Sequence, residues 1–262
     1  MRPLAAVLAL LAVPALAETQ DDLLTARLLP GWQEADGSRM AGISLTLAPG
    51  WKTYWRAPGE AGIPPLFDWS GSTNLAAVDL HWPSPQVIAL NGMDSIGYLD
   101  GVTLPIRVVP VDPSLPVHLA LKMDLGICHD ICMPAALDLS VDLTGEGAPD
   151  AAIASALRAG PITGEAAGLS ALSCRVEPIA DGLRLTASLN LPPQGGREKV
   201  VFESGADIWV SESRTDRVGG VLTASADLVP PNGQPFALDR SGVTVTVLAQ
   251  GHSVELHGCP AP

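Results

Sequence analysis

Two stretches of strict alternation between apolar and polar residues constrain the fold of this chain more than any other feature. In residues 117–128 the apolar side chains recur at every second position, and the same period returns in residues 137–143. A period of two over such lengths is typical of a β-strand with one buried face. The sequence therefore predicts an antiparallel hairpin whose turn lies between Cys128 and Cys132.

Both cysteines are expected on the same face of this hairpin. Continuing each alternation toward the turn puts Cys128 and Cys132 on the face opposite to the core. If residues 129–131 form a three-residue loop, the two cysteines are direct cross-strand neighbours. Their Cα atoms would then lie about 4.5–5.5 Å apart, which a disulfide tolerates. A bulge, or an early end of the ladder at Pro134, would shift this register.

The composition favours an all-β fold. The chain has 262 residues with 26 Gly, 24 Pro and only 16% charged residues, which argues for short strands joined by turns rather than long solvated helices. Five of the six tryptophans lie in residues 32–82, a clustering more typical of a sandwich core than of a binding platform. Further strands are predicted at residues 23–29, 41–47, 51–55, 66–69, 76–82, 104–109, 183–189, 199–203, 208–210, 221–229, 243–248 and 254–256. Residues 83–100 are expected to form a long irregular loop.

The segment at residues 146–168 is expected to divide the chain into two domains. It is rich in Gly, Ala and Pro, and residues 150–159 carry one short helical pattern with Asp150 as a candidate N-cap. We therefore predict a first β-sandwich domain at residues 18–145, which carries the cysteine pair, and a second at residues 169–262.

The N-terminus predicts export. Residues 1–17 combine one positive charge, a short apolar run and small residues before a cleavage point after Ala17, as in a secretory signal peptide. That run is too short to cross a bilayer and no later stretch is apolar enough, so no membrane anchor is expected. An exported protein is in an oxidising compartment, where disulfides persist. The net charge of −13 argues against a nucleic-acid partner and against an anionic membrane surface.

The four cysteines allow three pairings. Cys174 and Cys259 lie at the two ends of the second domain, and a structural disulfide between them would stabilise the domain by roughly 4 kcal/mol in the chain-entropy model. The alternative is that both are unpaired. A Cys128–Cys132 bridge closes a loop too short to add much stability, and short exposed disulfides are labile. A redox pair is therefore favoured there, with a purely structural bridge as the alternative.

The turn residues next to the pair suggest two further roles, in thiol activation and in metal binding. A protonated His129 would lower the pKa of a neighbouring thiol and Asp130 would oppose it, although a histidine at such a position is more often a solvated turn residue. Cys128, His129, Cys132 and Met133 are soft ligands that suit Cu(I) or Zn(II). A structural zinc site needs a second ligand pair at recognisable spacing, and none is evident. No metal and no other cofactor is expected, and signatures of nucleotide-binding loops, nucleophile elbows and zinc peptidases are absent from the sequence.

A set of short motifs recurs in one order along residues 29–143. They are GWKTYWRAPG at residues 50–59, GIPP at 62–65, DW at 68–69, WP at 82–83, GY at 97–98 and CHDICMP at 128–134. Together they resemble the N-terminal periplasmic domain of the DsbD/ScsB thiol–disulfide reductases. The resemblance implies an immunoglobulin-like sandwich, and the second half is similar to the second module of the ScsB type. We therefore expect two immunoglobulin-like β-sandwich domains in tandem.

The same resemblance implies a function. The cysteine pair would receive electrons from a transmembrane thiol reductase and pass them to periplasmic disulfide-containing proteins, in the periplasm of a Gram-negative bacterium. Cys132 would face the partner. A cap loop within residues 88–99 would shield the pair, with Met93 and Tyr98 as covers. The sequence shows no counterpart of the family's transmembrane segment or thioredoxin-like domain, so a separate electron donor is expected.

The leading hypothesis is thus an electron shuttle that works by thiol–disulfide exchange through Cys128 and Cys132. The alternative is a non-enzymatic β-sandwich binding module, which could carry Cu(I) or serve copper tolerance. The two hypotheses differ in whether the cysteines are needed for function.

Overall fold

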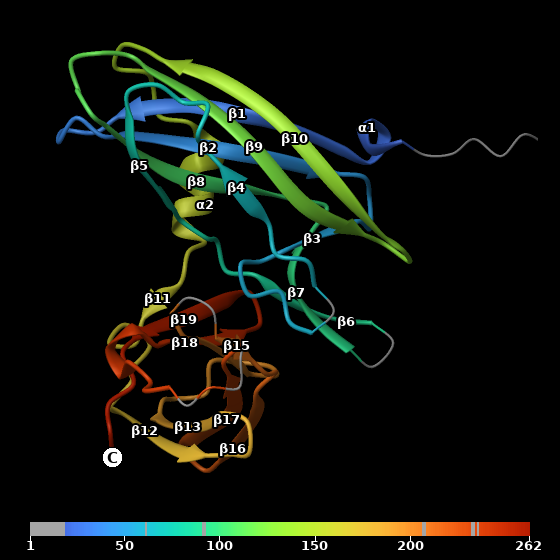
Figure 1. Ribbon diagram of the computed structural model, residues 1–262, viewed down its shortest axis with the longest axis vertical. Coiled ribbons are helices and arrows are strands. Elements are labelled where there is room, and N and C mark those ends of the chain that lie inside the picture. Colours follow the sequence, from blue (N-terminus) through green and yellow to red (C-terminus); the bar gives the residue numbers. More distant parts are fainter. Residues whose placement is uncertain (1–18, 61, 91–92, 206–207, 232–233, 235) are drawn as a thin grey trace, which may run out of the picture.

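The computed structural model describes residues 19–262 except residues 61, 91–92, 206–207, 232–233 and 235. The described chain forms two β-sandwiches in tandem with one short helix between them in sequence (Figure 1). This agrees with the predicted fold class. The predicted signal peptide at residues 1–17 lies outside the described residues.

The first sandwich consists of two sheets, preceded by the short helix α1 (Gln20–Leu23). One sheet has the order β1-β2-β8-β5, with β1 (Leu24–Gln33), β2 (Arg39–Leu47), β8 (Gly101–Pro110) and β5 (Leu75–Leu80). The other has the order β10-β9-β3-β7-β6, with β10 (Cys132–Leu143), β9 (Val117–Cys128), β3 (Lys52–Tyr54), β7 (Met93–Leu99) and β6 (Gln86–Leu90). The short strand β4 (Leu66–Asp68) pairs with β9 beyond the end of β3.

The alternating residues of β9 form the centre of the first core. Leu119, Leu121 and Met123 are fully buried there against residues of the facing sheet such as Ile43 and Ile106. Burying a side chain of this size contributes about 1.5–3 kcal/mol. The hairpin that carries the cysteines is therefore anchored by its own apolar face.

The expectation of a long irregular loop at residues 83–100 was wrong. β6 and β7 form a hairpin within this segment and extend the second sheet. The reason lies in β7, where consecutive residues from Ser95 to Tyr98 are all buried. A strand that is covered on both faces has no alternation between apolar and polar residues, so the sequence pattern does not reveal it.

The predicted helix is present as α2 (Ala151–Arg158), and it packs on the first sandwich. The Asp150 side chain accepts hydrogen bonds from the backbone N–H groups of Ala152 and Ile153, as an N-cap does. Ile153 is fully buried against Leu29 and Met40. The chain then enters the second sandwich at β11 (Ile162–Thr163), which pairs with β19 (His252–His257).

The second sandwich also has two sheets. One has the order β11-β19-β18-β14, where β18 is Thr244–Ala249 and β14 is Lys199–Glu203. The other has the order β12-β13-β17-β15, with β12 (Ala171–Pro178), β13 (Leu183–Asn190), β17 (Val221–Val229), β15 (Trp209–Val210) and β16 (Arg214–Val218) beside β17. A 3-10 turn, η1, spans Arg240–Gly242. The sequence patterns missed β11, β12 and β16.

The two sandwiches meet at β7 and at the segment that follows β3 in the first sandwich. Trp55, Ile96 and Tyr98 pack against Leu248 of the second sandwich in a separate buried cluster. Tyr98 is aligned with Thr53 and Ile127 across the sheet, so these residues share one face. At β9 this face of the sheet is part of the first core, and at β7 it contacts the second sandwich.

Ion pairs reinforce the contact between the sandwiches. The Arg56 guanidinium stacks on Trp55 and binds two carboxylates of the second sandwich, Glu203 at 2.8 Å and Glu255 at 2.6 Å. Asp94 of β7 accepts hydrogen bonds from Lys199 and Arg197, each at 3.0 Å. The segment after β3 and the β6–β7 hairpin are thus both tied to the second sandwich.

Candidate functional site

The β9–β10 hairpin places the cysteine pair at its end. The two strands pair in register from Leu143 opposite Val117 to Cys132 opposite Cys128, with residues 129–131 as the connecting turn. This is the register predicted from the alternation. A disulfide joins Cys128 and Cys132, whose Cα atoms are 4.1 Å apart.

The two sulfur-bearing residues differ strongly in exposure. Cys128 is only 1% exposed, whereas Cys132 is exposed. Both lie on the face opposite to the core, as expected, but only Cys132 is open to solvent. The difference follows from strand order, since β10 is an edge strand while β9 is also paired with β3.

Tyr54 covers the buried sulfur. Its hydroxyl donates a hydrogen bond of 2.9 Å to Cys128 Sγ and lies 3.5 Å from Cys132 Sγ. Burial raises the pKa of the Tyr54 phenol, so the group stays protonated and remains a donor. No local sequence pattern indicates this contact, because Tyr54 reaches the pair through the long-range pairing of β3 with β9.

The segment after β3 folds back over Tyr54. Gly62 lies so close to the Tyr54 ring that a Cβ at residue 62 would be 2.9 Å from Tyr54 Cδ1. Ile63 lies over Gly126 of β9, where a Cβ would be 2.9 Å from the Ile63 Cβ. Two glycines therefore permit the close packing that shields the buried side of the disulfide.

A buried lysine lies on the same face. Lys52 is directly opposite Cys128 in the register, is 7% exposed, and donates a 3.0 Å hydrogen bond from Nζ to Ser95 Oγ. Nζ is also 6.0 Å from the centroid of the Tyr54 ring. Burial lowers the pKa of the Lys52 ammonium, because removal from water disfavours the charged form.

The comparison with known proteins assigns the first sandwich. Residues 25–142 match the family model described as "Thiol:disulfide interchange protein DsbD, N-terminal". Residues 25–142 form a DsbD N-terminal domain. The family is one of thiol–disulfide interchange proteins, in agreement with the resemblance carried by the sequence motifs.

A solved structure extends the likeness to both sandwiches. The chain is similar to the N-terminal periplasmic domain of ScsB from Proteus mirabilis, with a TM-score of 0.67 and 25% identity over 94% of this chain and 96% of that chain. Coverage of that extent includes the second sandwich. No curated protein matches the sequence.

In this DsbD N-terminal domain the cover of the cysteine pair differs from the expected one. Tyr98 lies on the opposite face of the sheet, and its hydroxyl donates a 2.8 Å hydrogen bond to the Pro83 carbonyl oxygen. It therefore does not contact the sulfur atoms. The backbone of Met93 belongs to β7, but the position of its side chain lies outside what the structure describes.

The turn residues His129 and Asp130 form an exposed pair. His129 Nδ1 is 2.9 Å from Asp130 Oδ2, and the imidazole ring lies 6.0 Å from the Trp51 ring. The histidine side chain is 47% exposed. His129 therefore follows Cys128 in the chain, but its imidazole is paired with the Asp130 carboxylate.

The second cysteine pair of the protein is in a different setting. A disulfide joins Cys174 and Cys259, with Cα atoms 5.5 Å apart, and both residues are completely buried in the second core. The Arg240 guanidinium donates hydrogen bonds to the backbone oxygens of both cysteines. This bridge lies inside the second sandwich, away from the DsbD N-terminal domain.

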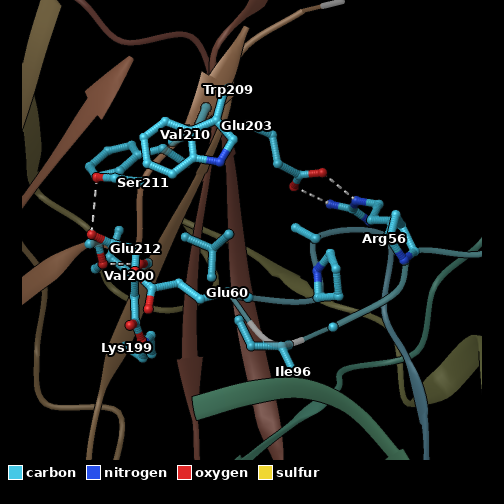
Figure 2. A pocket seen from close by; sticks show the side chains of 18 of the residues that line it. Arg56, Glu60, Ile96, Lys199, Val200, Glu203, Trp209, Val210, Ser211 and Glu212 are labelled. Carbon is cyan, nitrogen blue, oxygen red and sulfur yellow. Dashed lines mark hydrogen bonds and ion pairs between the residues drawn. The ribbon is translucent and has the colours of Figure 1, made fainter. Parts of the chain in front are cut away.

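A cleft of about 810 Å³ lies between the segment after β3 and the second sandwich (Figure 2). Arg56 and Glu60 line it on one side, while Glu203, Trp209 and Glu212 line it on the other. Neither Cys128 nor Cys132 borders it. The cleft is thus separate from the cysteine site, although both adjoin the same covering segment.

Two structural findings concern metals and membranes. Within the described part of the chain, no group of three or more His, Cys, Asp or Glu side chains lies together as a metal site would require. None of the helices in that same part has the length and hydropathy needed to span a bilayer.

Proposed function

We propose that the protein is a periplasmic electron shuttle that exchanges dithiols and disulfides through Cys128 and Cys132. It would accept electrons from a transmembrane thiol reductase and deliver them to disulfide-containing periplasmic proteins. The observation that carries the proposal is the cross-strand disulfide with one exposed and one buried sulfur, inside a DsbD N-terminal domain.

The geometry supports an order of attack. Only Cys132 is exposed, so an incoming thiolate can reach its sulfur, while Cys128 is shielded by Tyr54. In the reduced protein Cys132 would attack the acceptor disulfide, and Cys128 would then resolve the mixed disulfide. The pairing of twelve residues on each strand holds the hairpin without help from the bridge, so opening it need not unfold the site.

The proposal is tested by redox titration of the folded protein against glutathione, with thiols counted by mass spectrometry. We expect two thiols to appear together at mild potentials, from Cys128 and Cys132, while Cys174 and Cys259 stay oxidised until the protein is denatured. A Cys128–Cys132 bridge as resistant to reduction as the second bridge would contradict the shuttle.

Trapping experiments test the order of attack and identify partners. A Cys128→Ser variant should accumulate mixed disulfides through Cys132, because the resolving sulfur is gone. A Cys132→Ser variant should accumulate far fewer, since Cys128 is buried. The double variant Cys128→Ser, Cys132→Ser is the control, and binding of partners that survives in it would favour a non-enzymatic binding module.

A further inference from the structure

Lys52 has an unusual environment for a lysine. It is almost fully buried, and among the ion pairs between described residues none includes Lys52. Among the residues that the structure describes, its Nζ donates only to the neutral hydroxyl of Ser95. Buried lysines normally have a charged partner, because an uncompensated ammonium in a protein interior is costly.

Cys128 is a candidate for the missing charged partner of Lys52. Lys52 and Cys128 are directly opposed on antiparallel strands, so their side chains project from the same face with Cα atoms about 4.5–5.5 Å apart. In the disulfide form Cys128 carries no charge. In the dithiol form it can become a thiolate on the same face as the buried ammonium. The Tyr54 ring adjoins both groups, since its centroid is 6.0 Å from Lys52 Nζ and its hydroxyl is 2.9 Å from Cys128 Sγ.

Building on the proposed redox function, we propose that Lys52 is the counter-charge of the Cys128 thiolate. The lysine stays unpaired in the oxidised protein and gains its partner on reduction. It therefore acts as a positioning residue that favours the reduced pair and keeps Cys128 ready as the resolving nucleophile.

The exchange steps show where the charge arises. A donor thiolate attacks Cys132 Sγ, the Cys128–Cys132 bond breaks, and Cys128 leaves with the electron pair as a thiolate on the face that also carries Lys52. The second donor thiol, as a thiolate, then attacks the donor sulfur of the mixed disulfide and releases Cys132, which takes up a proton. The donor dithiol is oxidised to a disulfide, and the cysteine pair gains the two electrons.

Other charged and titratable groups near this thiolate do not substitute for Lys52. Tyr54 is neutral and donates a hydrogen bond to the same sulfur. In the turn, His129 pairs with Asp130, and both are exposed. On β9 itself Asp124 is exposed, and in the covering segment Arg56 is bound by two carboxylates of the second sandwich.

The first test measures the pKa of the Cys128 thiol in a Cys132→Ser background. The rate of alkylation by iodoacetamide is measured as a function of pH in the protein that keeps Lys52 and in the same protein with Lys52→Met. Loss of the ammonium should raise the pKa of the thiol by about one unit, which leaves about tenfold less thiolate at neutral pH. Lys52→Arg retains the charge and should restore most of the effect.

The matched control is Lys122→Met. Lys122 is an exposed lysine on β9, six residues from Cys128 and therefore about 20 Å away along the strand. Its removal changes the net charge of the protein equally but should leave the thiol pKa unchanged. In the protein with both cysteines, Lys52→Met should also shift the equilibrium with glutathione about tenfold toward the disulfide, and Lys122→Met should not.

A second measurement needs no substitution and so does not depend on a variant that folds. Because coupling between two sites is reciprocal, reduction of the disulfide should raise the pKa of the Lys52 ammonium. Nuclear magnetic resonance of ¹³C-labelled lysine in the wild-type protein reports it directly. An identical Lys52 pKa in both redox states would overturn the inference.

The outcomes also separate this inference from the function on which it rests. A wild-type pair that never exchanges with glutathione would contradict the shuttle itself. A pair that exchanges normally, with the same thiol pKa in Lys52→Met and in the parent, would leave the shuttle intact and reject the role of Lys52.

Discussion

The hydroxyl of Tyr54 donates a 2.9 Å hydrogen bond to the sulfur of Cys128 from the adjacent strand. The phenol ring is buried beneath Gly62 and leaves Cys132 exposed on the other side of the disulfide. The two sulfur atoms of the disulfide therefore differ. The shielded Cys128 Sγ can be stabilised as a leaving group, and the exposed Cys132 Sγ can be attacked by a partner.

Substituting Tyr54 with Phe should raise the pKa of the Cys128 thiol. The variant keeps the ring but removes the donor, and hydrogen bonds to charged groups contribute about 1.5–3 kcal/mol. We expect slower alkylation of Cys128 at neutral pH in a Cys132→Ser background, with an unchanged fold by circular dichroism.

Tyr98→Phe is the matched control for that prediction. Its hydroxyl is also buried and donates to a backbone oxygen, but it lies on the opposite face of the sheet. The control should lower the free energy of unfolding by about 1 kcal/mol and leave the thiol pKa unchanged. Equal effects of the two variants on the thiol would contradict a specific role of Tyr54.

Gly126→Ala should open the cover over the cysteine pair. The added Cβ would lie 2.9 Å from the Ile63 Cβ and 3.2 Å from Tyr54 Cε2, so both must move. Overpacking of this kind costs about 1–3 kcal/mol. We expect faster alkylation of Cys128 in a Cys132→Ser background, measured under native conditions.

The control is Gly220→Ala, where a Cβ would meet no atom within 4 Å. It should change neither stability nor alkylation. If Gly126→Ala left the accessibility of Cys128 equal to that of this control, the covering segment would not be what shields the buried sulfur.

The hairpin was predictable because its evidence is local. Alternation along β9 and β10 is set by one buried face, and the short turn fixes the register to the residue. The N-cap at Asp150 and the helix after it were predictable for the same reason. Each of these features depends on residues that are close in sequence.

The surroundings of the disulfide were not predictable in this way. Lys52 and Tyr54 are brought to Cys128 by the pairing of β3 with β9, which joins residues more than 70 positions apart in the sequence. The residues around Lys52 and Tyr54 do not indicate which strand pairs with them. The strand β7 was hidden because the second sandwich covers its other face at Ile96 and Tyr98. The family resemblance placed Tyr98 in a cap loop at the site, whereas it belongs to the contact between the sandwiches.

Removal of the second disulfide should destabilise the second sandwich without changing the redox pair. The Cys174–Cys259 bridge links residues 85 positions apart, and the chain-entropy model gives it roughly 4 kcal/mol. In a Cys174→Ala, Cys259→Ala variant we expect a loss of that order in urea denaturation. The equilibrium of Cys128 and Cys132 with glutathione should stay the same.

The comparison variant is Cys128→Ala, Cys132→Ala. This bridge closes a separation of only four residues, for which the same model gives about 2 kcal/mol. A loss as large as that from the second bridge would indicate that the first bridge is structural, against its proposed role.

The contact between the sandwiches should weaken in acid through Asp94. Burial alone would raise the pKa of this carboxyl. The hydrogen bond and charge of Lys199, followed by the charge of Arg197, lower the pKa by more than burial raises it, so the net pKa is below the ordinary 3.8. A carboxyl with a depressed pKa in the folded state stabilises the fold above its unfolded pKa. That contribution is lost as the pH falls through the folded pKa.

Small-angle scattering should therefore show the same radius of gyration from neutral pH down to about pH 4, and an increase below it as the two sandwiches separate. Asp94→Asn should give the larger radius at neutral pH and remove this part of the pH dependence. Asp36→Asn is the control, because Asp36 has a lowered pKa from Ser38 and Arg107 within the first sandwich and does not reach the second. A radius for Asp94→Asn that matches the wild type at every pH would show that Asp94 does not hold the two sandwiches together.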